Sequence, residues 1–265
     1  MTIDADARIH PSAVVEDGAK IGAGCVLGPF SVVGPHVRLL DGVILKSHAV
    51  VTGRTTIGPE TVVFPFASIG EIPQDLKFKG EDTELLVGAR NRIREGVTMN
   101  TGTEGGGGVT RVGDDCLFMT GAHVAHDAQV GDRVIAANQS AIAGHCVIED
   151  DVILGGLAGI HQFVRIGRGA IIGAVTMVTN DVIPYGLVQG PRGELSGLNL
   201  VGLKRRGVER SDITALRAAY QMLAQGDGAF LERARRLESE AESSYVRDIT
   251  SFILADTERR FLTPG

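Results

Sequence analysis

The chain has 265 residues, of which 43% are hydrophobic and 22% charged, and its formal net charge is −6. This composition can bury a full core, which argues against a disordered chain. Glycine accounts for 36 residues but follows no every-third-residue pattern, which excludes a collagen helix. The sequence contains neither a run of roughly 18 uncharged apolar residues nor a signal peptide. We therefore expect a soluble, cytoplasmic protein without stable membrane insertion.

Charge is unevenly distributed along the chain. Residues 1–190 hold 14 Lys or Arg and 21 Asp or Glu, whereas residues 191–265 hold 12 and 11. The C-terminal region is therefore chemically distinct, and we expect a domain boundary near residue 190.

A period of six residues runs through the first of these regions. Apolar residues recur at every sixth position from Ile9 to Ile69, and again from Val112 to Val178. An α-helix has a period of 3.6 and a single strand a period of two, so this period predicts short strands separated by turns. Three hexads make one coil, and the coils stack into an all-β parallel β-helix over residues 1–190. The period alone does not fix the handedness of the coils.

Two segments interrupt the repeat, near residues 70–86 and 100–111. The first contains the polar run QDLK, and the second contains TGTEGGGG. Loops that leave a regular solenoid often carry function, although tolerated surface insertions would look the same.

The three cysteines are odd in number and lack metal-binding spacing. Cys25, Cys116 and Cys146 fall at repeat positions where small residues recur. We interpret them as buried structural thiols.

After Val178 the repeat gives way to a helical pattern. Ser211 is the expected N-cap of one helix, and Gly226 its expected end. A second helix is predicted further along the chain, and together they form a C-terminal α-helical domain over residues 191–265. The expected apolar faces consist of Ile213, Leu216, Tyr220 and Leu223, and of Val246, Ile249, Phe252 and Ile253.

Positions separated by one coil, which is three hexads, are expected to stack on neighbouring coils, and this gathers several histidines on one edge. One coil after His126 the sequence has Gly144, and one coil after Gly144 it has Gln162. The neighbouring histidines on this edge are His123, His145 and His161. A neutral imidazole near pH 7 suits a general base that takes a hydroxyl proton. Asp127 is expected to pair only weakly with His126, because adjacent strand residues point in opposite directions.

Other interpretations of this edge stay open. Three histidines could bind zinc, as in carbonic-anhydrase-like β-helix trimers. The histidines could also merely occupy turns of a non-catalytic scaffold. The basic run Lys204, Arg205 and Arg206 suits phosphate oxygens, although a solvated helix face would have the same composition.

Several motifs resemble those of one known family. They include QDLK at residues 74–77, HVAHD at 123–127, LAGIHQF at 157–163 and GLKRRG at 202–207. The chain resembles, over nearly its whole length, the acyl-[acyl-carrier-protein] UDP-N-acetylglucosamine O-acyltransferases that begin lipid A biosynthesis. The resemblance implies a left-handed β-helix and a cytoplasmic homotrimer with active sites between subunits. It implies transfer of an (R)-3-hydroxyacyl group from acyl carrier protein to the 3-hydroxyl of UDP-N-acetylglucosamine, with no metal, no other cofactor and no nucleic acid.

The resemblance also implies roles for individual residues. His126 would be the general base, and the backbone N–H of Gly144 the donor to the oxyanion. The residues that would hold the sugar nucleotide or the acyl group are Asp75, Lys77, His123, His145, His161 and Gln162, with Asn199, Arg205 and Arg206 near the nucleotide.

The chain departs from the family pattern at two positions. Val201 stands where better-known members have a glutamate, so a nucleotide contact is absent or replaced there. Ala174 stands where a glycine lines the end of the acyl groove, and its methyl group should favour a shorter chain. The basic tail, with Arg233, Arg235 and Arg236, could attract the acidic carrier protein, although a solvated face is an equal alternative.

Overall fold

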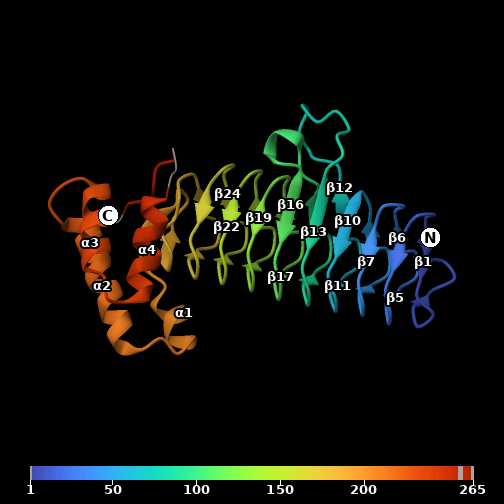
Figure 1. Ribbon diagram of the computed structural model, residues 1–265, viewed down its shortest axis with the longest axis horizontal. Coiled ribbons are helices and arrows are strands. Elements are labelled where there is room, and N and C mark those ends of the chain that lie inside the picture. The colour runs from blue at the N-terminus through green and yellow to red at the C-terminus, as the bar shows by residue number, and fades with distance from the viewer. Residues whose placement is uncertain (1, 256–258, 264–265) are drawn as a thin grey trace.

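Short parallel strands stack into three sheets that form the sides of a prism, and helices follow at its C-terminal end (Figure 1). The computed structural model describes residues 2–255 and 259–263. Most strands have two residues, of which the second points into the prism and is buried. Consecutive strands belong to consecutive sheets, so three hexads complete one coil, as the period of six predicts.

The strands are distributed over sheets that we name A, B and C. Sheet A contains β1 (Thr2–Ile3), β4 (Lys20–Ile21), β7 (Arg38–Leu39), β10 (Arg54–Ile57), β13 (Glu84–Val87), β16 (Val109–Val112), β19 (Gln129–Val130), β22 (Val147–Ile148) and β25 (Arg165–Ile166). Sheet B contains β2 (Arg8–Ile9), β5 (Val26–Leu27), β8 (Ile44–Leu45), β11 (Val62–Val63), β14 (Arg92–Ile93), β17 (Leu117–Phe118), β20 (Ile135–Ala136), β23 (Ile153–Leu154), β26 (Ile171–Ile172), β28 (Gly186–Gln189) and β29 (Glu194–Leu198). Sheet C contains β3 (Val14–Val15), β6 (Val32–Val33), β9 (Val50–Val51), β12 (Ser68–Glu71), β15 (Thr98–Asn100), β18 (His123–Val124), β21 (Ala141–Ile142), β24 (Gly159–Ile160) and β27 (Met177–Val178).

The core is the column of inward residues that runs along the prism axis. Val124 pairs with Ile142, and Ile142 with Ile160, so strand partners are separated by three hexads of sequence. These side chains are at most 2% exposed. The smaller residues of the repeat fill the corners. The three cysteines are among them, and the prediction of buried thiols is confirmed because all three are free and buried. Burial raises the pKa of Cys116 to about 12, so this thiol is not ionised near pH 7.

The prism turns through a tight corner after each strand. The second residue of a regular corner has positive φ whether or not it is glycine, as in Asp127 (60°), His145 (61°) and Phe163 (66°). These three residues lie on the edge where the chain passes from sheet C to sheet A, which we call the C–A corner. A left-handed turn residue redirects its side chain, which decides the geometry of the candidate site.

Both interruptions of the repeat leave the prism at this same corner. Ile57 pairs with Val87, and Val87 pairs with Val112, so both of these coils are longer than the regular three hexads. The extra residues form loops after β12 and after β15, and both project from one side of the prism (Figure 1). The second loop contains a short 3₁₀ helix, η1 (Glu104–Gly106).

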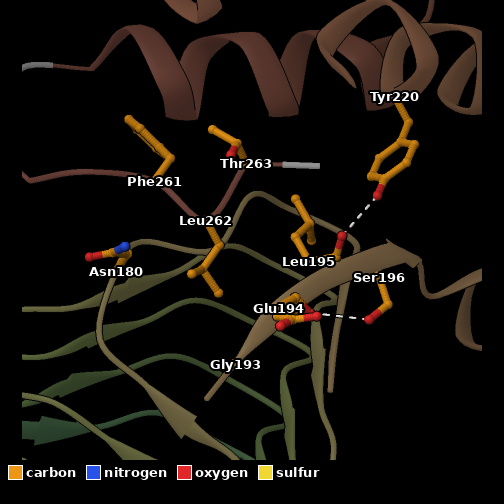
Figure 2. A pocket seen from close by; sticks show the side chains of 9 residues that line it. All are labelled: Asn180, Gly193, Glu194, Leu195, Ser196, Tyr220, Phe261, Leu262 and Thr263. Carbon is orange, nitrogen blue, oxygen red and sulfur yellow. Dashed lines mark hydrogen bonds between the residues drawn. The ribbon is translucent and has the colours of Figure 1, made fainter. Parts of the chain in front are cut away.

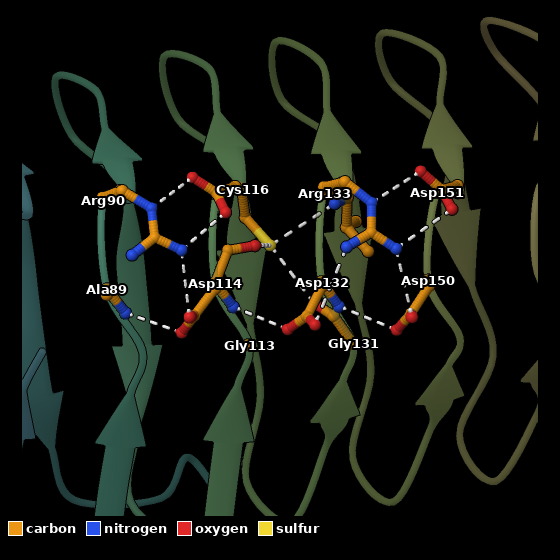
Figure 3. A network of polar contacts seen from close by, with 12 residues as sticks. Ala89, Arg90, Gly113, Asp114, Cys116, Gly131, Asp132, Arg133, Asp150 and Asp151 are labelled. Carbon is orange, nitrogen blue, oxygen red and sulfur yellow. Dashed lines mark hydrogen bonds and ion pairs between the residues drawn. The ribbon is translucent and has the colours of Figure 1, made fainter. Parts of the chain in front are cut away.

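A ladder of aspartates and arginines follows the edge between sheets A and B, the A–B corner (Figure 3). A carboxylate oxygen of Asp132 accepts the N–H of Asp114 on the preceding coil at 2.8 Å, and Asp150 accepts that of Asp132 at 3.0 Å. Arg90 and Arg133 form ion pairs with the ladder, Arg133 with Asp150 at 3.2 Å. The carboxylates thus tie one coil to the next through the backbone.

The C-terminal region differs from its predicted outline in two respects. Strand β29 extends sheet B past residue 190, so the helical part begins at residue 200. The longest helix begins at Arg210, with Glu209 as N-cap, so the predicted cap at Ser211 is wrong, because the chain already turns helical one residue earlier. Gly226 ends this helix as predicted. The helices are α1 (Leu200–Arg205), α2 (Arg210–Gln225), α3 (Phe230–Glu240) and α4 (Ser244–Leu254).

The helical region is bound to the last coils by buried polar contacts. Asp181, which is fully buried, pairs with Arg165 at 2.6 Å and accepts the N–H of Leu262 through its carbonyl. The hydroxyl of Tyr185 donates a hydrogen bond to Asp248 of α4.

Among the residues that the structure describes, no helix is long and apolar enough to cross a membrane.

Candidate functional site

Three successive coils place the predicted residues one above another at the C–A corner. The carbonyl of His126 accepts the N–H of His145 at 3.1 Å, and the carbonyl of Gly144 accepts the N–H of Phe163 at 3.0 Å. The imidazole of His145 stacks on the ring of Phe163, with centroids 4.4 Å apart and planes 3° apart. His126 meets His145 edge to face, with centroids 5.0 Å apart. The predicted stacking of positions one coil apart is therefore confirmed.

Asp127 holds His126 directly. The Nδ1 atom of His126 lies 2.8 Å from Oδ2 of Asp127, whose side chain is 1% exposed. The expectation that this pairing would be weak is wrong, because both residues lie in the turn after β18 and Asp127 has a left-handed backbone. An ionised carboxylate only accepts hydrogen bonds, so in a neutral imidazole this contact places the proton on Nδ1 and leaves Nε2 with its lone pair. That is the tautomer a general base requires.

Gly144 covers one face of the His126 ring. A Cβ atom built on Gly144 would lie 2.6 Å from Cε1 and 2.8 Å from Nε2 of His126. Any side chain at residue 144 would therefore displace the ring. Within residues 2–255 and 259–263, the N–H of Gly144 donates to no acceptor. This N–H is thus available to an oxygen of a bound molecule.

The two flanking histidines are held in their neutral form. Burial lowers the pKa of His123, and the nearby His126 lowers it further, while Thr98 Oγ1 lies 2.7 Å from its Nδ1 atom. Burial also lowers the pKa of His145, although the carboxylates of Asp127 and Asp75 act in the opposite direction. Asp75 belongs to the loop after β12, which leaves the prism at this same corner.

The remaining predicted residues of this edge are more exposed. Lys77 is exposed in the same loop, where its N–H donates to Asp75 at 3.0 Å. His161 and Gln162 are exposed on the coil after His145. The structure therefore gathers on one edge the residues Asp75, Lys77, His123, His126, Gly144, His145, His161 and Gln162.

The predicted nucleotide residues lie on a different edge of the same chain. A Cβ on Gly169, at the A–B corner, would lie 2.6 Å from the Arg206 guanidinium, and Arg205 is exposed in the last turn of α1. The Asn199 side chain is buried, caps α1 and donates to the carbonyl of Gly169 at 2.9 Å. Ala174 lies at the third edge, between sheets B and C. One chain alone therefore does not bring these residues to His126.

The zinc hypothesis can be compared with the side chains that could bind a metal ion at this edge. His126, Asp127 and His145 place one possible ligand atom each within 4.8 Å of one another. This set has two histidines and a carboxylate, not the three histidines of the zinc hypothesis. The Asp127 carboxylate already accepts from His126, from Thr103 N at 2.8 Å and from Thr103 Oγ1 at 2.6 Å. Three of its roughly four acceptor sites are thus used by the protein itself, which fits a positioned histidine better than a metal ligand.

A cavity of about 370 Å³ lies away from His126, between β29, α2 and the C-terminal segment (Figure 2). Tyr220 closes one side of it by donating to the carbonyl of Leu195 at 3.0 Å. None of the predicted site residues lines this cavity.

Comparison with known proteins agrees with this arrangement. Residues 181–262 match the family model "Udp N-acetylglucosamine O-acyltransferase; Domain 2", and residues 1–35 and 18–53 match the bacterial transferase hexapeptide repeat. An acyl-[acyl-carrier-protein]–UDP-N-acetylglucosamine O-acyltransferase of Paracoccus denitrificans is 67% identical over 98% of this chain and 99% of its own length. This chain belongs to that acyltransferase family. The relative of the same name from Rhizobium johnstonii is 52% identical over 99% of this chain and 97% of its own length.

Solved structures of the family share the fold throughout. The UDP-N-acetylglucosamine acyltransferase of Campylobacter jejuni superimposes with a TM-score of 0.91 at 35% identity, covering 97% of this chain and all of that one. The Francisella novicida enzyme gives 0.80 at 32% identity, covering 98% and 94%. The expected fold, a left-handed β-helix with a C-terminal helical domain, is confirmed, as is the family resemblance.

Proposed function

We propose that the protein transfers an (R)-3-hydroxyacyl group from acyl carrier protein to the 3-hydroxyl of UDP-N-acetylglucosamine, the first step of lipid A biosynthesis. The observation that carries the proposal is the His126 imidazole, whose Nδ1 is held by Asp127 and whose Nε2 lies against Gly144. The names of the family relatives supply the substrates.

In the proposed reaction, Nε2 of His126 takes the proton of the sugar hydroxyl as its oxygen attacks the thioester carbonyl. A carbon–oxygen bond forms, and the carbonyl oxygen becomes an oxyanion that accepts the N–H of Gly144. The carbon–sulfur bond then breaks, and the imidazolium returns the proton to the departing thiolate. The products are the acylated sugar nucleotide and the free thiol of the carrier, and no acyl-enzyme forms.

The neighbouring residues would orient the two substrates. Neutral His123 and His145 can donate or accept hydrogen bonds without placing a positive charge beside the base. Asp75 and Lys77, with the exposed His161 and Gln162, would contact the sugar nucleotide or the acyl group. The methyl group of Ala174 would shorten the acyl groove.

The nucleotide residues imply a second subunit. Arg205 and Arg206 lie at the A–B corner, and His126 lies at the C–A corner. We propose a cytoplasmic homotrimer in which the A–B corner of one subunit faces the C–A corner of the next. The buried Asn199 then positions the arginines indirectly, because its side chain caps α1 and these arginines lie at the end of that helix. The exposed Val201 offers no polar group to the nucleotide.

The basic tail is proposed to attract the carrier protein. Arg233 serves the fold, because its guanidinium donates to the carbonyl of Gly226 at 2.8 Å. Arg235 and Arg236 are exposed on α3 and are the better candidates for contact with an acidic partner.

The test is a transfer assay with a 3-hydroxyacyl carrier protein and UDP-N-acetylglucosamine. His126→Ala should lower kcat by about 10²-fold or more, because the hydroxyl loses its base. Calorimetry should find the affinity for the sugar nucleotide changed by less than about threefold, since the other contacts persist. His10→Ala, at an exposed turn, is the control. A His126→Ala enzyme with wild-type turnover would remove the proposed base.

A further inference from the structure

The carboxylate of Asp127 is held by more than His126. Thr103 donates twice, from its backbone N–H to Oδ1 at 2.8 Å and from its hydroxyl to Oδ2 at 2.6 Å. The backbone N–H of Asp127 donates to the hydroxyl of Thr110 at 2.7 Å. Asp127 is 4% exposed, so these contacts replace water almost completely.

Thr103 belongs to the glycine-rich loop between β15 and β16, which folds down over Asp127. A Cβ built on Gly106 would lie 2.0 Å from the carboxyl carbon of Asp127, so only glycine permits this approach. The N–H groups of Gly106 and Gly108 both donate to the carbonyl of Thr103, at 3.0 and 2.8 Å. The loop therefore closes around Thr103 and presses it onto the carboxylate.

We propose that Thr103 is a positioning residue for the acyl transfer, which acts through Asp127 on the orientation and tautomer of His126. The proposal rests on the proposed function. The two donors of Thr103 fix the plane of the Asp127 carboxylate. Oδ2 of Asp127 accepts from the Thr103 hydroxyl and keeps one acceptor site for Nδ1 of His126. Without the hydroxyl, Oδ2 of Asp127 would be free to rotate away from Nδ1 of His126, and the contact that selects the Nδ1–H tautomer would weaken.

The effect should appear in the pH dependence of turnover. The titratable groups that face His126 are Asp127, His145 and His123, and Asp75 acts on His145 from the loop after β12. Without the Thr103 hydroxyl the carboxylate can turn away from the imidazolium, and this weaker contact lowers the pH at which the His126 imidazolium loses its proton. The acidic limb of the kcat profile should therefore move to lower pH in Thr103→Val.

The experiment compares three variants in the full-length protein. Thr103→Val keeps the shape and the backbone N–H but lacks the hydroxyl, and Thr103→Ser keeps both donors. Thr101→Val is the matched control, because the Thr101 hydroxyl lies in the same loop but contacts Thr83 instead of Asp127. Each variant is measured for kcat, for both KM values, for its pH profile and for its melting temperature.

Thr103→Val should lower kcat at least about tenfold, with little change in either KM. This loss is a part of the roughly 10²–10⁴-fold rate increase that a positioned general base contributes. Thr103→Ser should retain activity within about threefold, and Thr101→Val should keep the wild-type pH profile. If Thr103→Val matched Thr101→Val in kcat and pH profile, Thr103 would only attach the loop to the coil.

A second measurement separates this proposal from the proposed function. The imidazole ¹⁵N–¹H spectrum reports the tautomer of His126, assigned with His126→Gln. The Nδ1–H tautomer of His126 should dominate in the wild type and in Thr103→Ser. In Thr103→Val the Nδ1–H and Nε2–H tautomers should both be populated. If the wild type transferred no acyl group but showed this pattern, the proposed function would fail and the positioning would stand. An unchanged tautomer in Thr103→Val would overturn the positioning itself.

Discussion

At the scale of single residues, two half-buried histidines with lowered pKa values flank His126. Burial is the main reason that the pKa of His123 and of His145 lies below the ordinary value. In the unfolded chain these histidines titrate at about pH 6.5. The unfolded state therefore binds more protons than the folded state below about that pH, and stability falls as the solution becomes more acidic.

His123→Gln should weaken this acid sensitivity. Between about pH 7.5 and 5 the melting temperature of the wild type should fall, and it should fall less in the variant, because glutamine does not titrate and can still bond to Thr98. The exposed His10→Gln serves as the control and should keep the wild-type slope. A His123→Gln protein with an unchanged slope would contradict a neutral His123 in the folded state.

The spacing of the sequence predicted the stacking of His126, Gly144 and His145, because a coil of three hexads converts sequence separation directly into position. It did not predict Asp127 or Phe163 as members of the site. Both have left-handed backbones, and the rule of alternating side chains applies to strands and not to such turns. The period of six therefore locates a residue on an edge, and the turn conformation decides where its side chain points.

At the scale of elements, coils are tied together by carboxylates that accept backbone N–H groups. Asp132→Ala should lower the free energy of unfolding by about 1–2 kcal/mol, because the N–H of Asp114 loses its acceptor. Arg90→Ala should cost less stability than Asp132→Ala, since the ion pairs of Arg90 are half-exposed and screened by water. Asp132→Asn, which keeps an acceptor oxygen, is the control and should retain most of the stability. Urea unfolding of the three variants would contradict this account if Arg90→Ala were the most destabilised.

The loops and helices were less predictable than the coils. The break in the repeat located both loops, but not the contact of Gly106 with Asp127, because that contact joins segments without a shared period. The apolar faces of α2 and α4 were evident from the spacing of residues such as Leu216 and Ile249. Helix α3 was not predicted, since it buries only Ala234 and Leu237 and most of its other residues are charged.

At the scale of the whole molecule, the residues assigned to one reaction lie on different edges of the prism. His126 occupies the C–A corner, and Arg206 lies against Gly169 at the A–B corner. A closed ring of identical subunits can bring these edges together at every interface. The central claim is therefore that each complete site takes its base from one subunit and its phosphate contacts from the next.

Mixed trimers of His126→Ala and Arg206→Ala subunits test this claim most directly. The measurement is acyl transfer at a low concentration of UDP-N-acetylglucosamine, where trimers of either single variant are slow. In a one-to-one mixture, about a quarter of the interfaces pair an intact His126 with an intact Arg206 of the neighbouring subunit. We predict that the mixture recovers about that share of wild-type activity. Activity equal to the mean of the two separate variants would show that the two residues do not act across a subunit interface.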